Sequence, residues 1–90
     1  MKKYIIEREM PTVGSMTGQE LCEAAHTSNN ALAMFSPKVQ WQHSYITNDK
    51  TFCIYLSETE EDIRSHSELS GFSANKITEV VTIIDPTTVK

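Results

Sequence analysis

Residues 39–57 have the sequence VQWQHSYITNDKTFCIYLS, the pattern of two β-strands joined by a short turn. Trp41, His43 and Tyr45 alternate with polar residues. A period of two places alternate side chains on the same face of a strand. Asn and Asp tolerate a positive φ, so the Asn-Asp pair at 48–49 is expected to close a two-residue loop. The segment therefore predicts a β-hairpin with three large side chains in one stripe.

The length of this loop decides which residues of the second strand share a face with the stripe. With a two-residue loop, three cross-strand pairs lie on the same face as the stripe: Tyr45 with Phe52, His43 with Ile54, and Trp41 with Leu56. A three-residue loop turns the other face of the second strand toward the stripe, so that Cys53 and Tyr55 lie there instead. We favour the two-residue loop because it leaves fewer polar groups in an apolar layer.

A strand and a helix are expected before the hairpin. Residues 3–9 alternate as a strand, which the following proline ends. A helix then begins at the capping box of Thr17 and Glu20 and runs to residue 34 or 35, where the Ser-Pro pair at 36–37 ends it. Its inward positions are mostly alanine and serine. Such small residues either bring the helix close to the sheet or leave room beneath it.

A second helix and a last strand are expected after the hairpin. Four acids between residues 58 and 62 suit a first helical turn, since free backbone N–H groups favour carboxylates there, with Ser57 or Thr59 as the cap. Gly71 ends this helix. One helix face collects Ile63, His66, Ser67 and Ser70. Residues 77–84 are rich in Ile, Val and Thr and predict the last strand.

This order of elements predicts a ferredoxin-like α+β fold, βαββαβ, as one domain over residues 1–90. Right-handed crossovers place the first and third strands in the middle of a four-stranded antiparallel sheet, with both helices on one face. If the stripe faces the helices, the bare face includes Gln40, Gln42, Ser44, Cys53 and Tyr55. Because such a face needs cover, we expect a homodimer of the dimeric α+β barrel type.

Composition excludes several classes of protein. The chain is 39% hydrophobic and 22% charged, as ordinary globular domains are. Its net charge of −4, without a basic stripe, argues against nucleic-acid binding. We expect neither a signal peptide nor a membrane span, because no long apolar run is present. Cys22 and Cys53 lack metal or redox spacing and are expected to be reduced thiols, so we expect a cytoplasmic protein.

Two histidines are the candidates for chemistry. If the stripe faces the helices, His43 and His66 lie in one layer, and imidazole suits Ni, Cu, Zn and Fe. Glu7 or Glu9 and Glu79 interrupt apolar strands and can complete the site, while Tyr45 can add a phenol oxygen or a hydrogen bond. The predicted metal site is thus His43, His66, Glu7, Glu79 and Tyr45. No HxH, HExxH or CxxC motif accompanies these residues, so the alternative is two histidines satisfied within the core.

Five segments of the chain resemble one family of small bacterial proteins: residues 6–11, 40–50, 63–68, 71–80 and 84–88. The family was long catalogued as a domain of unknown function and takes its current name from a nickel-binding member. The resemblance implies a ferredoxin-like dimer and nickel as the first candidate metal. The residues that match are His43, His66, Glu7, Glu9 and Glu79. Gln42 and residues 67–69 depart from the family pattern, which bears on the identity of the metal.

A second hypothesis belongs to a different class. Dimeric ferredoxin-like proteins of this size include small monooxygenases and isomerases that work in a pocket between sheet and helices. In that case His43 would act as acid or base and Tyr45 would orient the substrate. A pocket lined by Ala24, Ala25 and Ser28 would favour this function. Whether the protein is an enzyme stays open at this point, as does a plain interaction protein without a ligand.

Overall fold

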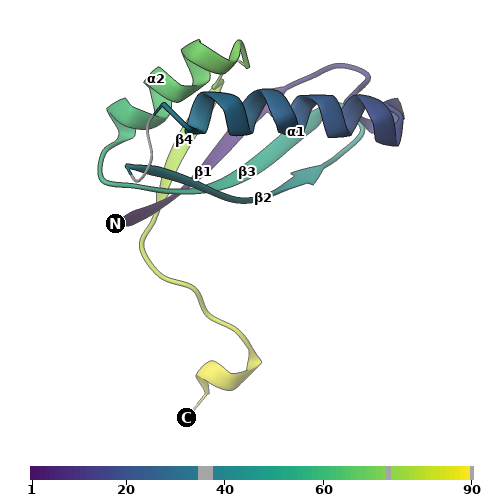
Figure 1. Ribbon diagram of the computed structural model, residues 1–90. Coiled ribbons are helices and arrows are strands. Elements are labelled where there is room, and N and C mark those ends of the chain that lie inside the picture. The colour runs from purple at the N-terminus through teal and green to yellow at the C-terminus, as the bar shows by residue number, and fades with distance from the viewer. Residues whose placement is uncertain (35–37, 73, 90) are drawn as a thin grey trace.

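One four-stranded sheet with two helices on one of its faces forms the body of the protein (Figure 1). The computed structural model describes residues 1–34, 38–72 and 74–89. In chain order the elements are β1 (Lys2–Glu9), the 3-10 turn η1 (Val13–Ser15), α1 (Gly18–Leu32), β2 (Val39–Ile46), β3 (Lys50–Ser57), α2 (Glu60–Ser70), β4 (Lys76–Val80) and the 3-10 turn η2 (Pro86–Thr88). The strands lie in the order β2-β3-β1-β4, and all neighbours are antiparallel. The predicted ferredoxin-like α+β fold, with the first and third strands in the middle, is confirmed.

The capping box that begins α1 is present as predicted. The backbone N–H of Glu20 donates to the Thr17 hydroxyl over 3.2 Å, and the backbone N–H of Thr17 donates to the Glu20 carboxylate over 3.0 Å. These bonds satisfy donors that the first helical turn leaves free. The helix ends at Leu32. It is therefore shorter than predicted, since its end was expected at residue 34 or 35; the Ser-Pro pair at 36–37 lies outside the described residues.

Helix α2 also has the expected boundaries. The Thr59 hydroxyl accepts from the backbone N–H of Asp62 over 3.2 Å, and three acids follow in the first turn. Gly71 ends the helix with φ of 79°, a left-handed conformation that suits glycine. Its buried residues are the four predicted ones: Ile63, His66, Ser67 and Ser70.

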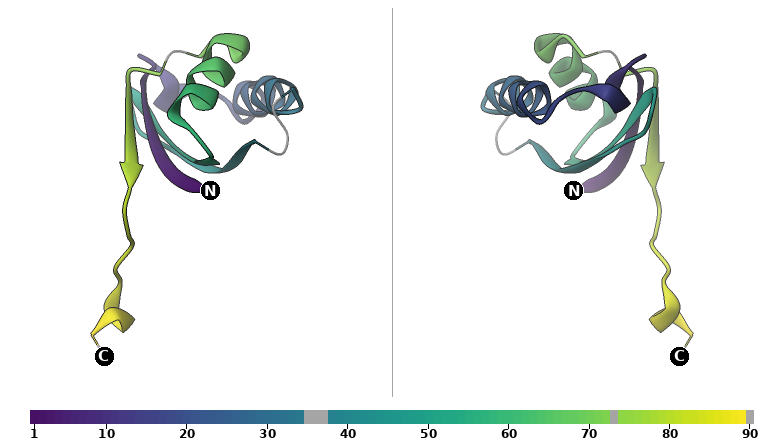
Figure 2. Two further views of the ribbon diagram at one scale, coloured as in Figure 1. Left: turned by 90° about the vertical axis from the view of Figure 1, so that its left-hand side faces the viewer. Right: turned by 90° about the vertical axis from the view of Figure 1, so that its right-hand side faces the viewer.

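The last strand is shorter than predicted. It ends at Val80, opposite Lys3, instead of continuing to residue 84. The reason is that β1 begins at Lys2, so β4 soon has no strand to pair with. From residue 81 the chain runs away from the body as an extended segment (Figures 1 and 2), which we call the C-terminal arm, residues 81–89.

The hairpin has the predicted two-residue loop, closed in a different way. The backbone N–H of Thr47 donates to the Lys50 carbonyl over 2.9 Å, and the backbone N–H of Lys50 donates to the Thr47 hydroxyl over 3.0 Å. Among the described residues other than glycine, only Thr12 has a positive φ. The Asn-Asp pair therefore forms the loop without the left-handed backbone that the sequence suggested.

A β-bulge in β2 corrects the prediction for the stripe. His43 pairs with Ile54 and Tyr45 with Phe52, as expected, but Trp41 pairs with Tyr55 instead of Leu56. The irregularity lies between Trp41 and His43, and one extra residue reverses the face of everything beyond it. Trp41 therefore faces the helices, whereas His43 and Tyr45 lie on the other side of the sheet.

The two faces of the sheet differ in their cover. The face beneath the helices, the covered face, carries the core residues Tyr4, Ile6, Val39, Cys53 and Tyr55, against which Ile63 packs. The opposite face, the open face, carries Ile5, His43, Tyr45, Phe52, Ile54 and Leu56. Ser44, Cys53 and Tyr55 were expected on the bare face and lie on the covered one, because the central strand β1 turns Tyr4 and Ile6 toward the helices and these two residues pair with Tyr55 and Cys53.

Candidate functional site

His43 and Tyr45 are neighbours on the open face. The His43 Nε2 and Tyr45 Oη atoms are 3.2 Å apart, and the rings meet edge to face with centroids 5.1 Å apart. Both side chains are exposed. The bulge in β2 produces this arrangement, since it turns both residues away from the helices. The result is an imidazole nitrogen and a phenol oxygen held together at the surface.

His66 lies on the opposite side of the sheet, in the core. Its side chain is fully buried, and Nε2 lies 3.4 Å from the carbonyl oxygen of Ser28. Burial lowers the pKa of His66, the bond to Ser28 acts in the opposite direction, and the positive charge of Arg8 lowers the pKa further. The prediction that His43 and His66 share one layer is therefore wrong, because the sheet separates them.

The acidic candidates are also apart from His66. Glu7 lies on the open face, where its Oε2 is 3.7 Å from the Lys50 ammonium. Glu79 is on the edge strand β4, where its Oε1 lies 3.8 Å from the Lys2 Nζ. Across residues 1–34, 38–72 and 74–89, no three His, Cys, Asp or Glu side chains come together as a metal site within one chain. Of the five predicted ligands, one chain thus brings together only His43 and Tyr45.

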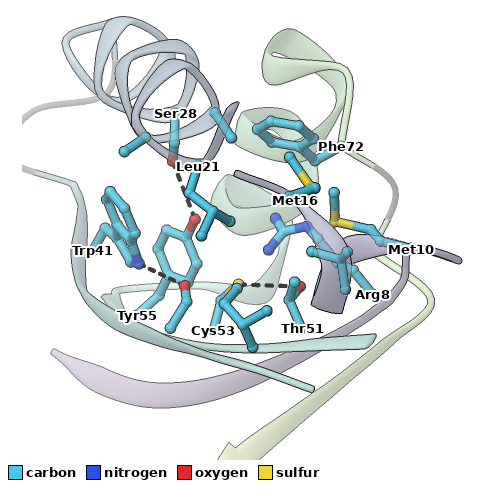
Figure 3. A pocket seen from close by; sticks show the side chains of 15 residues that line it. Arg8, Met10, Met16, Leu21, Ser28, Trp41, Thr51, Cys53, Tyr55 and Phe72 are labelled. Atoms are coloured by element: carbon cyan, nitrogen blue, oxygen red, sulfur yellow. Dashed lines mark hydrogen bonds between the residues drawn. The ribbon is translucent and has the colours of Figure 1, made fainter. Parts of the chain in front are cut away.

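A cavity of about 220 Å³ lies between α1 and the covered face (Figure 3). The sequence left open whether the small residues of α1 bring the helix close or leave room, and the structure has room. Ala24, Ala25 and Ser28 form the helix side of the cavity. Apolar side chains supply most of the rest: Met10, Val13, Met16, Leu21, Trp41 and Phe72.

Arg8 is the charged group of this cavity. Its side chain is only 3% exposed, and its Nη2 donates to the Ser67 hydroxyl over 2.9 Å. The guanidinium carbon lies 5.8 Å from the centre of the Tyr55 ring, within the range of a cation–π contact. Its Nε is buried without a hydrogen-bond partner.

Arg8 was not among the site residues predicted above, although the sequence contains a signal for it. Arg8 falls on the same alternation as Tyr4 and Ile6, the two core residues of β1. A charge at such a position is unusual, because arginine is almost never fully buried unless it is paired. This alternation is the feature that would have identified it.

Tyr55 places a neutral hydroxyl beside this guanidinium. Its Oη is 3.4 Å from the Ser28 hydroxyl, and either group can donate. Burial raises the pKa of Tyr55 above its usual value, while the Ser28 bond and the positive charge of Arg8 act in the opposite direction. The phenol therefore stays protonated at neutral pH and remains a donor.

The strand order, with both helices on one face, defines a small ferredoxin-like α+β protein. The chain belongs to the family described as nickel responsive protein SCO4226-like, whose sequence model matches residues 4–80. This confirms the resemblance seen in the sequence.

Among solved structures, the chain is similar to the crystal structure of SCO4226 from Streptomyces coelicolor A3(2). The TM-score is 0.75 and the sequence identity 15%, over 91% of this chain and 99% of that chain. At this identity the likeness supports the fold alone. No curated protein matches the chain. In the described part of the chain, no helix is long and apolar enough to cross a membrane.

Proposed function

We propose that this protein binds a divalent transition metal, nickel first among the candidates, at a site on the open face that two copies of the chain complete. The observation that carries the proposal is the adjacent imidazole and phenol of His43 and Tyr45 on an exposed sheet surface. Imidazole is a good ligand for nickel, copper and zinc. The description of the family as nickel responsive adds support.

The second copy is needed because one chain offers too few ligands at one point. Glu7 shares the open face with His43, but β3 lies between their strands. Strands are about 4.8 Å apart, so two strand spacings give about 10 Å, too far for one ion to be shared directly. A two-fold dimer presents the same patch twice, and packed sheets lie about 10 Å apart. The partner's copies of His43, Tyr45 and Glu7 would then come within reach.

His66 and Glu79 are not ligands in this arrangement. His66 is fully buried on the other side of the sheet, and Glu79 pairs in register with Tyr4, a covered-face residue. The proposed set is therefore His43 and Tyr45, with Glu7 as the acidic ligand.

Two features support pairing through the open face. Its centre is apolar, with Ile5, Phe52, Ile54 and Leu56 partly exposed. The C-terminal arm exposes Val81 at 91% and Ile84 at 76%. Ile5 and Ile54 are neighbours in the sheet, and exposed apolar surface of this kind commonly marks an interaction site. A homodimer in the cytoplasm, as the sequence suggested, is part of the same proposal.

Titration of metal-free protein with nickel chloride in a calorimeter tests the proposal. We expect His43→Ala to weaken binding by about tenfold or more, since it removes a nitrogen ligand from each copy. His26→Ala is the matched control, because His26 is exposed on α1 and should leave binding unchanged. Copper should bind more tightly than nickel and zinc comparably, following the usual stability order. Nickel or zinc binding no tighter than about millimolar, or equal binding by His43→Ala, would refute the site.

A second candidate function rests on the cavity beneath α1. The sequence suggested a small enzyme of the monooxygenase or isomerase type with His43 as acid or base in such a pocket. His43 lies on the open face, so that role for it is wrong. The cavity itself is present, and its polar groups are Arg8, Tyr55 and Ser28. It favours a function in binding a small molecule.

A further inference from the structure

We propose that the cavity beneath α1 binds a small organic monocarboxylate, whose carboxylate pairs with Arg8 and whose apolar body fills the remaining space. This site is separate from the proposed metal site, because the two lie on opposite faces of the sheet. The inference deepens the second candidate function, and it stands or falls independently of nickel binding.

Arg8 has no counter-charge among the described residues. An arginine side chain is always protonated in proteins, and a buried charge is costly unless it is paired. The ion pairs of the described residues involve other groups, and no described carboxylate comes within ion-pair distance of Arg8. Among the described residues, Arg8 bonds to the neutral Ser67 hydroxyl and lies against the neutral Tyr55 side chain. An anionic ligand would supply the charge that the protein lacks here.

Arg8 keeps hydrogen-bond donors that Ser67 does not use. Its Nε is buried and has no hydrogen-bond partner, while Nη2 is occupied by Ser67. In Figure 3 the guanidinium lies among the lining side chains, between Tyr55 and Met16. A planar guanidinium fork matches the two oxygens of a carboxylate. Arg8 lines the cavity and has donors besides the one that Ser67 uses, so an anion in the cavity can pair with the guanidinium.

The lining of the cavity suits a carboxylate better than a phosphate. Among the described residues that line the cavity, Arg8 is the only charged one. A phosphate with close to two negative charges would need more donors than one guanidinium and a few hydroxyls. The remaining lining is mainly aliphatic, aromatic and methionine side chains, which suit a hydrocarbon body. One negative charge on an apolar body is the complementary ligand.

The size of the cavity limits that body. An apolar cavity of about 150 Å³ is enough to hold benzene. The present cavity, at about 220 Å³, has room for one ring and a carboxylate, or for a short aliphatic chain. Tyr55 and Ser28 can turn a hydroxyl toward the second carboxylate oxygen, since either one can donate in their mutual bond. Benzoate, phenylacetate and hexanoate are thus suitable probes.

The side-chain Nε–H signals of arginine provide a direct test by NMR. The chain has two arginines, Arg8 and the exposed Arg64, so Arg64 serves as a control within the same molecule. We expect benzoate, phenylacetate or hexanoate to shift the Arg8 signal until it saturates, and to leave the Arg64 signal in place. Neutral benzamide, with the same shape as benzoate, should bind at least about tenfold more weakly, because it lacks the charge that Arg8 pairs with.

Two variants complete the test. Arg8→Met should weaken benzoate binding at least about tenfold, whereas Arg64→Met should not change it. If Arg8→Met does not fold, Ala25→Phe provides the test, because it fills the cavity while Arg8 stays in place and should therefore weaken benzoate binding. Asn30→Phe, on the exposed side of α1, is its control. The proposal is overturned if none of the three acids binds at about 10 mM, if inorganic phosphate binds more tightly than all of them, or if benzoate binds equally to wild type and to Arg8→Met or Ala25→Phe.

Discussion

The hydroxyl oxygens of Tyr55 and Ser28 lie 3.4 Å apart and join the middle of the sheet to helix α1. Both side chains are buried, at 2% and 6% exposure. The bond lies where α1 has small residues, so the tyrosine ring reaches across space that larger helix residues would fill. The Tyr55–Ser28 hydrogen bond helps to set the distance between α1 and the sheet, and the cavity lies beside this bond.

Tyr55→Phe should lower the free energy of unfolding by about 1 kcal/mol, because it leaves the buried Ser28 hydroxyl without this partner. Tyr45→Phe is the matched control: Tyr45 is 59% exposed, and its loss of a hydroxyl should change stability by less than about 0.5 kcal/mol. Urea unfolding followed by circular dichroism measures both. Equal losses in the two variants would show that the Tyr55 bond contributes nothing particular.

Stability should fall as the pH decreases below about 6.5, and His66 should account for part of the loss. The pKa of His66 lies below its ordinary value of 6.5 in the folded state, mainly because of burial. Below that pH the unfolded chain binds a proton that the folded chain does not, so unfolding is favoured. The contribution of one such group is at most about 1.4 kcal/mol per pH unit.

His66→Gln provides the measurement of this effect. Urea unfolding at about pH 7.5 and about pH 5.5 should show a smaller loss of stability for His66→Gln than for wild type, even though the variant starts from a lower value. His26→Gln, on the exposed side of α1, should retain the wild-type pH dependence. Identical pH dependence in wild type and His66→Gln would contradict the assignment.

The parts of the fold that local chemistry specifies could be predicted from the sequence. The capping box of Thr17 and Glu20 begins α1, and Gly71 ends α2, because both signals act within a few residues. The topology followed from the order of the elements, since crossover handedness leaves few alternatives. The buried face of α2 followed from helical periodicity.

The candidate sites could not be predicted, because they depend on which face each strand residue occupies. A single bulge after Trp41 moves the side chains of His43 and Tyr45 to the other face of the sheet. Nothing in the alternating pattern of that strand indicates the bulge. The cavity depends on the distance between α1 and the sheet, which the Tyr55–Ser28 pair helps to set across 27 positions of sequence. The sequence carried usable information in two places: the small inward residues of α1, which line the cavity, and the alternation of β1, which places Arg8 on the side of Tyr4 and Ile6.

Gly14 should not tolerate a larger residue. Its backbone N–H donates to the Asn48 carbonyl over 3.0 Å, and an added Cβ would lie 2.6 Å from the Asn48 Cα. Gly14→Ala therefore has to separate the turn η1 from the hairpin loop, at a cost of about 1–3 kcal/mol in unfolding free energy. Gly18→Ala is the contrasting variant, because nothing lies within 4 Å of its Cβ position at the start of α1. Gly18→Ala should raise the free energy of unfolding by up to about 1 kcal/mol. If Gly18→Ala instead lowers it as much as Gly14→Ala does, the steric argument is refuted.

Pairing of two copies through the open face is tested by a charge at its centre. Ile54 lies between His43 and Ile5 in the sheet, so Ile54→Lys would bury an unpaired ammonium in the proposed interface. We expect the dissociation constant of the dimer to rise by about a hundredfold or more, since burying one unpaired ion costs several kcal/mol. Leu69→Lys makes the same change at an exposed position of α2 and should leave the dimer intact.

Sedimentation velocity at micromolar concentration should give the mass of two chains for wild type and Leu69→Lys and of one chain for Ile54→Lys. A wild-type mass of one chain, or a dimer that persists in Ile54→Lys, would show that the open face does not pair, and the proposed shared metal site would fail with it.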